Sequence, residues 1–130
     1  RIMKFLAVDY GQKRIGLAFA DSNLDLVLPY GLITKQKLGL QIAALAEIIN
    51  HDGVEKVIIG FPTGLGGGEN TNTARVKEFA FELGKVSPVA IEFFDERFST
   101  RAAAAASKKG VSRDEQAAMI ILSDYLKRKG

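Results

Sequence analysis

The chain has 130 residues, of which 47% are hydrophobic and 25% charged, and its formal net charge is +3. This composition indicates a globular domain and excludes a disordered chain, and no apolar run approaches the roughly 20 residues of a membrane-spanning helix. Cysteine is absent and one histidine occurs, which excludes disulfides, thiolate nucleophiles and zinc sites built from several histidines. The length predicts a single domain over residues 1–130, and the lack of cysteine is consistent with the cytoplasm.

Three strands are predicted at the start of the chain. Apolar residues alternate or cluster over residues 3–9, 14–21 and 26–34, and the connections between these segments are short. Short connections favour an antiparallel meander. Pro29 and Gly31 interrupt the third segment, which favours an edge position for that strand.

From residue 40 the apolar period becomes helical. It predicts a helix to residue 51 that Gly53 ends, followed by a continuous apolar strand, Val57-Ile58-Ile59, of the kind buried in parallel sheets. A second helix is predicted over residues 74–83. Its inward face comprises Val76, Phe79, Ala80 and Leu83.

The rest of the chain predicts one more strand and two helices. The strand follows Pro88, covers residues 89–94 and reads as buried, and the helices cover residues 99–107 and 114–127. The whole pattern predicts an α/β fold. Its sheet would be mixed and five-stranded, with three antiparallel strands, then two parallel crossover strands, and helices on both faces.

Acidic residues end two of the predicted strands. Asp9 follows the apolar run Phe5-Leu6-Ala7-Val8, and the pair Asp95-Glu96 ends the last strand. A carboxylate at the tip of a buried strand is costly unless a fixed cation, or a metal with a phosphate substrate, lies against it. Ligand sites of open α/β sheets lie off the carboxyl ends of parallel strands, and Asp9, Gly60-Phe61-Pro62 and Asp95-Glu96 all fall there.

Basic residues accompany these acidic strand ends. Lys13 and Arg14 follow Asp9, Arg97 follows the second acidic pair, and further lysines and arginines crowd the C-terminal quarter. One interpretation is a solvated surface with a basic tail. The other is a surface for a polyanion that metal ions bridge to the carboxylates.

Four motifs in a fixed order carry a family resemblance. The chain resembles the YqgF family of RNase H-like nucleases, which are also described as Holliday-junction-resolvase-like proteins and as pre-16S ribosomal RNA nucleases. The motifs span nearly the whole chain: Asp9-Tyr10-Gly11-Gln12-Lys13-Arg14-Ile15-Gly16, Gly60-Phe61-Pro62, Asp95-Glu96-Arg97-Phe98-Ser99-Thr100 and Asp114-Glu115-Gln116-Ala117-Ala118-Met119-Ile120-Ile121-Leu122.

The resemblance implies catalysis by Mg²⁺ or Mn²⁺ in a two-metal site, because hard cations prefer oxygen ligands. The ligands would be Asp9, the Asp95-Glu96 pair and Asp114. Strand alternation points Asp95 and Glu96 to opposite faces, so we expect only one of them to bind metal. Asp9 could instead be a turn residue. Asp114 could instead be an acidic residue of a first helical turn, where its charge interacts favourably with the helix dipole.

The resemblance also implies a set of residues that contact nucleic acid: Lys13, Arg14, Arg97, Ser99, Thr100 and Arg113. Arg14 and Arg97 could instead neutralise neighbouring acids, and Ser99 and Thr100 are first of all residues of a helix start. Family members commonly carry several basic residues before the aspartate of the last motif, whereas here Gly110-Val111-Ser112-Arg113 joins Asp114 directly. Either this member lacks the basic loop or the sequence omits a stretch.

The function that the resemblance implies is metal-dependent hydrolysis of structured RNA, with the 5′ end of pre-16S ribosomal RNA as the leading substrate. The alternatives are a Holliday junction resolvase, which needs a dimer, and an inactive nucleic-acid-binding module. The expected partner is nucleic acid rather than a membrane, and the protein would be a monomer or a homodimer. An ATP-dependent kinase or actin-like protein is disfavoured, since such folds need two domains of this kind.

Overall fold

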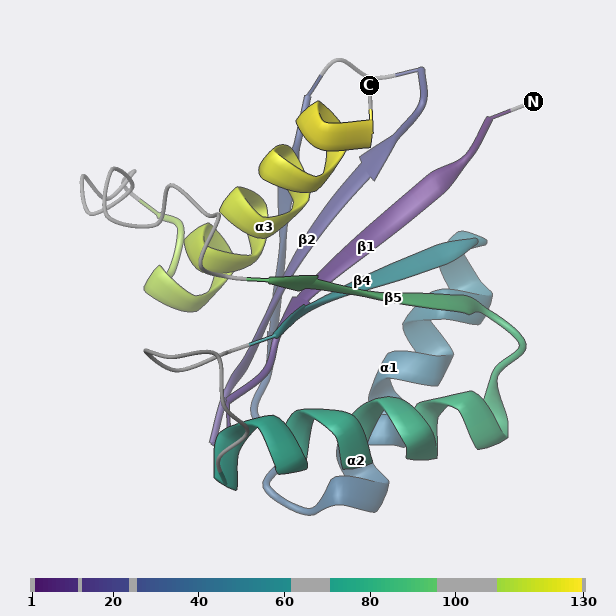
Figure 1. Ribbon diagram of the computed structural model, residues 1–130, viewed down its shortest axis with the longest axis vertical. Coiled ribbons are helices and arrows are strands. Elements are labelled where there is room, and N and C mark those ends of the chain that lie inside the picture. Colours follow the sequence, from purple (N-terminus) through teal and green to yellow (C-terminus); the bar gives the residue numbers. More distant parts are fainter. Residues whose placement is uncertain (1, 12, 24–25, 62–70, 96–109, 130) are drawn as a thin grey trace.

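The computed structural model describes residues 2–11, 13–23, 26–61, 71–95 and 110–129. The predicted helix over residues 99–107 lies outside these ranges. The described elements follow the predicted order along the chain (Figure 1), with ends that differ by a few residues: β1 (Lys4–Asp9), β2 (Ile15–Asp21), β3 (Leu28–Ile33), α1 (Leu38–Asp52), β4 (Lys56–Phe61), α2 (Thr71–Val86), β5 (Ala90–Asp95) and α3 (Arg113–Lys129).

The strands form one five-stranded mixed sheet in the order β3-β2-β1-β4-β5. β1 pairs antiparallel with β2 and parallel with β4, β2 pairs antiparallel with β3, and β4 pairs parallel with β5. The predicted meander, the two crossovers and the edge position of β3 are therefore confirmed. The carboxyl ends of β1, β4 and β5 all point to the left of Figure 1, where α3 begins.

Helices cover both faces of the sheet. α1 and α2 lie on one face and α3 lies on the other (Figure 1). Leu6 and Val8 of β1 are buried with α1 and α2, whereas Ala7 between them is buried with α3. This alternation is the two-residue period of a strand that is covered on both sides.

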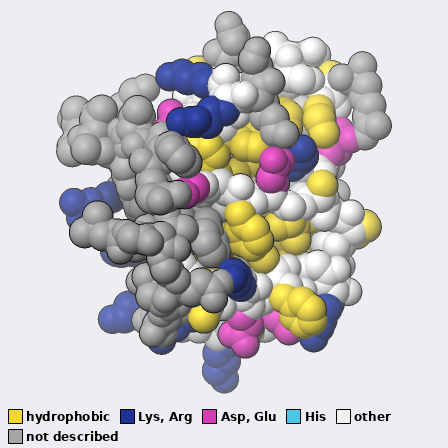
Figure 2. Space-filling model, in the orientation of Figure 1, with side chains coloured by type: hydrophobic (Ala, Val, Ile, Leu, Met, Phe, Trp, Pro, Cys, Tyr) yellow, Lys and Arg dark blue, Asp and Glu magenta, His cyan; other side chains and the backbone are white. Residues whose placement is uncertain are grey.

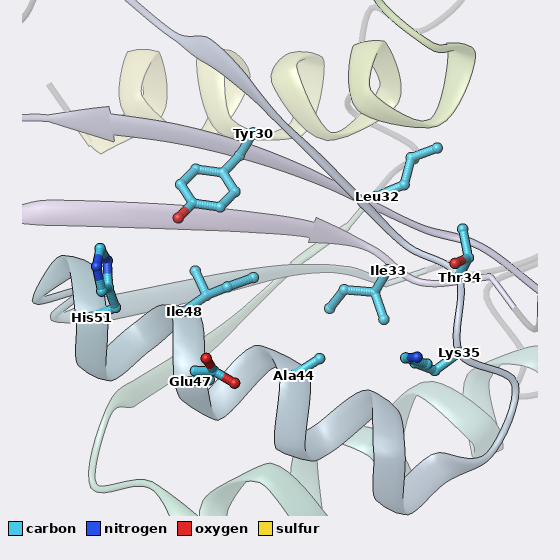
Figure 3. A pocket seen from close by; sticks show the side chains of 9 residues that line it. All are labelled: Tyr30, Leu32, Ile33, Thr34, Lys35, Ala44, Glu47, Ile48 and His51. Carbon is cyan, nitrogen blue, oxygen red and sulfur yellow. The ribbon is translucent and has the colours of Figure 1, made fainter.

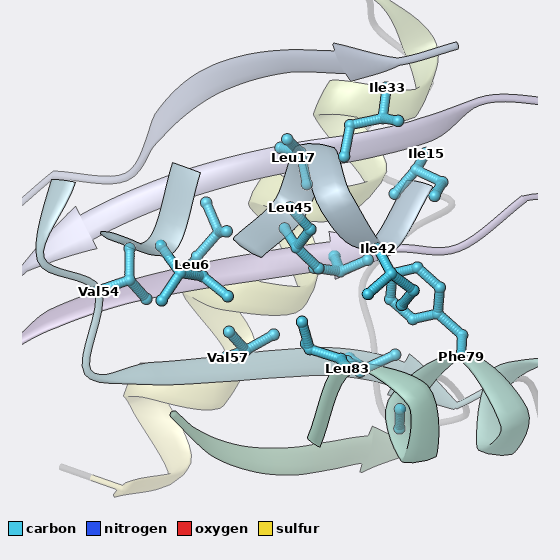
Figure 4. Close-up of a cluster of buried hydrophobic side chains, with 14 of the residues drawn as sticks. Leu6, Ile15, Leu17, Ile33, Ile42, Leu45, Val54, Val57, Phe79 and Leu83 are labelled. Atoms are coloured by element: carbon cyan, nitrogen blue, oxygen red, sulfur yellow. The ribbon is translucent and has the colours of Figure 1, made fainter. Parts of the chain in front are cut away.

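The larger core lies under α1 and α2 (Figure 4). The predicted inward face of α2 is confirmed, since Val76, Phe79, Ala80 and Leu83 are all buried in this cluster. α1 ends where the sequence predicts, because Gly53 adopts a left-handed conformation with φ 67° and its N–H bonds the carbonyl oxygen of Ile49.

The smaller core, between α3 and the sheet, is rich in alanine. Ala7 of β1, Ala18 and Ala20 of β2 and Ala118 of α3 are 0–1% exposed. Short side chains let the helix backbone come close to the strands. α3 therefore packs directly on β1 and β2, and its first turn reaches the carboxyl end of β1.

The prediction that the last strand is buried is wrong for most of β5. Among the described strands β5 stands at the edge of the sheet, where it pairs with β4 on one side. Phe94 is buried, but Ala90 is exposed and Phe93 is 43% exposed. Apolar side chains show on the surface between α2 and α3 (Figure 2), the region of β5 in Figure 1. Within the described part of the chain, no helix is long and apolar enough to cross a membrane.

Candidate carboxylate site

Asp9 is the last residue of β1, and its side chain is largely buried, at 8% exposure. Strand alternation assigns it to the face of Ala7, which is the α3 face. Its partner across the antiparallel pair is Gly16 of β2. The predicted charged tip of a buried central strand is therefore present.

Asp114 lies beside this tip because α3 begins against Gly16. A β-carbon built on Gly16 would stand 2.0 Å from the carbonyl oxygen and 2.9 Å from the β-carbon of Asp114. Real β-carbons do not approach backbone atoms so closely, so the contact requires glycine. Since Gly16 is also the register partner of Asp9, the fold brings the two aspartates of the first and last motifs to one place.

The start of α3 is fixed by a capping box that the sequence reasoning missed. The Ser112 hydroxyl accepts a hydrogen bond from the backbone N–H of Glu115 at 3.1 Å, and the Glu115 carboxylate accepts one from the N–H of Ser112 at 3.2 Å. The spacing Ser-x-x-Glu is a recognisable signal for this arrangement. Because Ser112 and Glu115 cap the helix, Asp114 is not its capping residue. The segment Gly110-Val111-Ser112-Arg113, which joins Asp114 directly, therefore leads into a well-defined helix start.

Arg14 holds the carboxylate of Asp114. Its Nε lies 3.1 Å from Oδ2 of Asp114, and the arginine side chain is 65% exposed whereas that of Asp114 is 27% exposed. The pair joins the β1–β2 turn to the first turn of α3. The alternative role predicted for Arg14, as a neutralising partner of a nearby acid, is thus present. Lys13 and Arg113 are both exposed.

Asp95 ends β5 two strands away from Asp9. β1 pairs with β4 and β4 with β5, so neighbouring strands place the tips of β1 and β5 about 10 Å apart. Ile91 packs on the core under α1 and α2, and Phe94 lies in the α3 cluster. Alternation therefore assigns Asp95 to the α1 and α2 face, opposite to Asp9.

The other residues predicted for the site, Glu96, Arg97, Ser99 and Thr100, lie outside the described residues. Within the described ranges, no three His, Cys, Asp or Glu side chains form a group that could hold a metal ion. Asp9 and Asp114 supply carboxylate oxygens only, and this donor chemistry suits Mg²⁺ or Mn²⁺ rather than a softer metal. A third carboxylate would complete a set for these ions.

A hollow of about 420 Å³ lies elsewhere, between β3 and α1. Ile33, Ala44 and Ile48 form its apolar part, with Tyr30 and His51 near one end and Lys35 near the other (Figure 3). Asp9, Asp95 and Asp114 are not among the residues that line it. The hollow is therefore separate from the carboxylate site.

Two polar clusters tie helices to the sheet away from the carboxylates. The Tyr30 hydroxyl donates a hydrogen bond to the Asp52 carboxylate, and Lys4 Nζ donates to the Asp52 carbonyl oxygen at 3.0 Å. The bond to Asp52, followed by burial, raises the pKa of Tyr30 to about 12. The same bond lowers the pKa of Asp52, with a smaller contribution from His51.

The second cluster joins α3 to β4 and β5. The Tyr125 hydroxyl donates to Glu92 at 2.6 Å and accepts from Lys56 Nζ at 3.2 Å, and Lys56 Nζ lies 3.2 Å from the Glu92 carboxylate. Burial and the bond to Glu92 raise the pKa of Tyr125. The bonds to Tyr125 and Glu92 raise the pKa of Lys56.

The chain matches a known protein family over nearly its whole length. Residues 3–128 match the family model of RuvX, which is described as "Holliday junction resolvase". A protein of Maridesulfovibrio salexigens named "Putative pre-16S rRNA nuclease" is 34% identical over 97% of this chain and 99% of its own length.

Two solved structures show the same fold at low identity. RuvC of T. thermophilus, in complex with a Holliday junction substrate, has a TM-score of 0.63 at 14% identity and covers 97% of this chain and 96% of its own. The Holliday junction resolvase of fowlpox virus also has a TM-score of 0.63, at 15% identity, over 97% of this chain and 99% of its own. The likeness supports the predicted RNase H-like fold over nearly the whole chain.

Proposed function

The chain belongs to the RuvX family, also called YqgF, and from this premise we propose that it is a metal-dependent nuclease that hydrolyses phosphodiester bonds in structured RNA. We propose the 5′ end of pre-16S ribosomal RNA as the leading substrate. The observation that carries the proposal is the meeting of Asp9 and Asp114 at Gly16, beside the carboxyl end of a buried central strand.

The proposed ligands are the carboxylates of Asp9 and Asp114 and one member of the Asp95-Glu96 pair. Two ions of Mg²⁺ or Mn²⁺ would supply an activated water and stabilise the leaving oxygen when bound. Asp9 is held by β1 and Asp114 by the capped start of α3. Rigid elements on both sides keep the oxygen ligands in place, so little ordering is needed on binding.

The face of Asp95 argues against that residue as the remaining ligand. Asp95 shares a face with Ile91, opposite to Asp9. We therefore propose that Glu96 binds metal and that Asp95 supports the end of β5.

Basic residues near the carboxylates would bind the phosphate backbone. Lys13 and Arg14 lie in the turn that follows Asp9, and Arg113 precedes Asp114. All three side chains are exposed. Their charges, with Arg97, Ser99 and Thr100 of the third motif, would position a polyanion without reading its sequence.

A second candidate function is resolution of Holliday junctions. The description of the matching family model favours it, since it names that activity. The same carboxylates would serve, but cutting two strands symmetrically requires two sites and hence a dimer. The oligomeric state of the protein therefore bears directly on the choice.

The test is cleavage of two kinds of substrate by the purified protein. A pre-16S 5′ stem RNA and a four-way DNA junction are each incubated with Mg²⁺ and with Mn²⁺, and the products are separated by size. We expect cleavage of the RNA that Asp9→Asn abolishes. Asp21→Asn is the matched control because Asp21 ends β2 at the other end of the sheet, opposite Lys4.

The outcomes separate the candidates. Faster cutting of the four-way junction by a dimer would favour the resolvase. Equal, poor cutting by the wild type and Asp9→Asn, with normal binding of both substrates, would leave only the binding module.

A further inference from the structure

Arg14 and Asp114 form an ion pair, although in the proposed function the two side chains bind different partners. Arg14 is a phosphate-binding residue in that scheme, and Asp114 is a metal ligand. In the structure the guanidinium Nε lies 3.1 Å from the carboxylate Oδ2. One charge of each sign is therefore already neutralised before any ligand arrives.

The two partners are held very differently. The backbone of Asp114 is seated against Gly16 and follows the Ser112 cap, so its position does not depend on Arg14. The Arg14 side chain is 65% exposed, and an ion pair in which one partner is largely solvated is weak and easily exchanged. Arg14 can thus leave while Asp114 stays.

The guanidinium group suits both possible partners. Its planar donors match a carboxylate and a phosphate equally well. A phosphate that enters beside Asp9 would compete with Asp114 for the same donors. A cation that enters would compete with Arg14 for the same carboxylate.

We propose that Arg14 is an exchangeable counter-ion of Asp114. Without substrate, it neutralises the carboxylate and weakens divalent-cation binding. When nucleic acid binds, Arg14 moves to a phosphate and frees Asp114 for the cation, so that each ligand promotes binding of the other. This inference rests on the proposed function, since it takes Asp114 as a metal ligand.

The proposal predicts effects of opposite sign from one substitution. Arg14→Gln should strengthen Mn²⁺ binding to the free protein and weaken binding of nucleic acid. A structural pair would predict weaker binding of both, together with a lower melting temperature. If Arg14 were a phosphate contact alone, nucleic-acid binding would weaken. The Mn²⁺ affinity would then change only as much as the removal of any one nearby positive charge changes it.

Mn²⁺ binding without nucleic acid is measured by titration calorimetry for the wild type, Arg14→Gln, Lys13→Gln and Asp114→Asn. Lys13→Gln is the matched control, since Lys13 is the neighbouring exposed cation. We expect Arg14→Gln to bind Mn²⁺ about twofold to fivefold more tightly than Lys13→Gln, the range for an exposed pair. The gain should vanish in the double variant Arg14→Gln/Asp114→Asn.

Binding of a stem-loop RNA without divalent cations is the second measurement. Arg14→Gln should bind more weakly, with a salt dependence reduced by about one phosphate contact. Equal Mn²⁺ affinity of Arg14→Gln and Lys13→Gln overturns the exchange, provided that Asp114→Asn loses Mn²⁺. If Asp114→Asn keeps both Mn²⁺ affinity and cleavage, the ligand role of Asp114 fails, and the exchange fails with it.

Discussion

Gly16 of β2 lies directly against the backbone of Asp114 in α3. The contact is so close that a β-carbon on Gly16 would stand 2.0 Å from the Asp114 carbonyl oxygen. Gly16 also pairs with Asp9 in the sheet. One hydrogen atom in place of a side chain thus allows the last helix to begin next to the end of the first strand.

Gly16→Ala should displace the start of α3. The added methyl group overlaps backbone rather than a flexible side chain, so we expect a loss of about 1–3 kcal/mol in the free energy of unfolding. The cleavage rate should fall by more than the loss of folded protein explains, because the substitution also displaces Asp114. Urea unfolding and cleavage rates check this.

Gly84→Ala is the control for this substitution. A β-carbon on Gly84 of α2 meets nothing within 4 Å, so alanine should stabilise the helix by up to about 1 kcal/mol. A Gly16→Ala protein as stable and active as the Gly84→Ala protein would contradict the close contact.

The Asp95-Glu96 pair should divide its roles by face. Asp95 is assigned to the α1 and α2 face, away from Asp9. We expect Glu96→Gln to reduce cleavage by at least 100-fold and Asp95→Asn by less than 10-fold, on the scale of a lost catalytic group. Cleavage rates at saturating Mg²⁺ measure both, and the reverse order would assign Asp95 to the metal.

Local patterns predicted the elements well, because strand and helix periods are local properties of the sequence. The central position of β1 and the edge position of β3 followed from short connections, right-handed crossovers and Pro29. The exposure of β5 did not follow, since four of the five residues from Ala90 to Phe94 are apolar, as in a central strand. The sheet order is what shows that, among the described strands, β5 has a neighbour on one side alone.

The candidate site was predicted in part. The tip at Asp9 was readable because a charge after four apolar residues is unusual. The capping role of Ser112 and Glu115 was also readable, from their spacing, and was missed. The contact between Gly16 and Asp114 and the pair of Arg14 with Asp114 join segments far apart in the sequence, and no local pattern encodes them.

The bond from Tyr30 to Asp52 should make stability depend on pH. Tyr30→Phe removes the hydroxyl that stabilises the charged form of Asp52. We expect a loss of about 1–2 kcal/mol in the free energy of unfolding at pH 7, as for a hydrogen bond to a charged group. Urea unfolding of both proteins from pH 2 to 11 measures the difference.

The sign follows from the two pKa shifts. The pKa of Asp52 is lowered on folding, so its contribution is complete above the unfolded value near 3.9 and is lost as the pH falls through the folded value. The pKa of Tyr30 is raised to about 12, so its contribution is complete below about 10 and is lost as the pH rises toward 12. A difference that stays constant across this range would contradict the bond.

Tyr125→Phe should lower the stability of the protein without changing its rate of cleavage. The substitution removes the hydroxyl that links Lys56 to Glu92 and leaves the ring in place. We expect a loss of about 1–2 kcal/mol in the free energy of unfolding. The kcat for cleavage should stay within twofold, because the cluster is far from Asp9. Lys56 lies beside Phe5 in the sheet, and Phe5 is about 13 Å from Asp9 along β1. A large loss of kcat with little loss of stability would instead connect this cluster to the site.

The alanines between α3 and the sheet have a consequence for how variation can affect this protein. Ala7, Ala18 and Ala118 carry no charge and no hydrogen-bonding side chain, yet their small size sets the spacing of the layer on which α3 rests. A single valine among them would thicken that layer and tilt the helix that carries Asp114. Sequence variants that impair cleavage should therefore occur at buried, chemically inert positions, where a search among charged residues would never look.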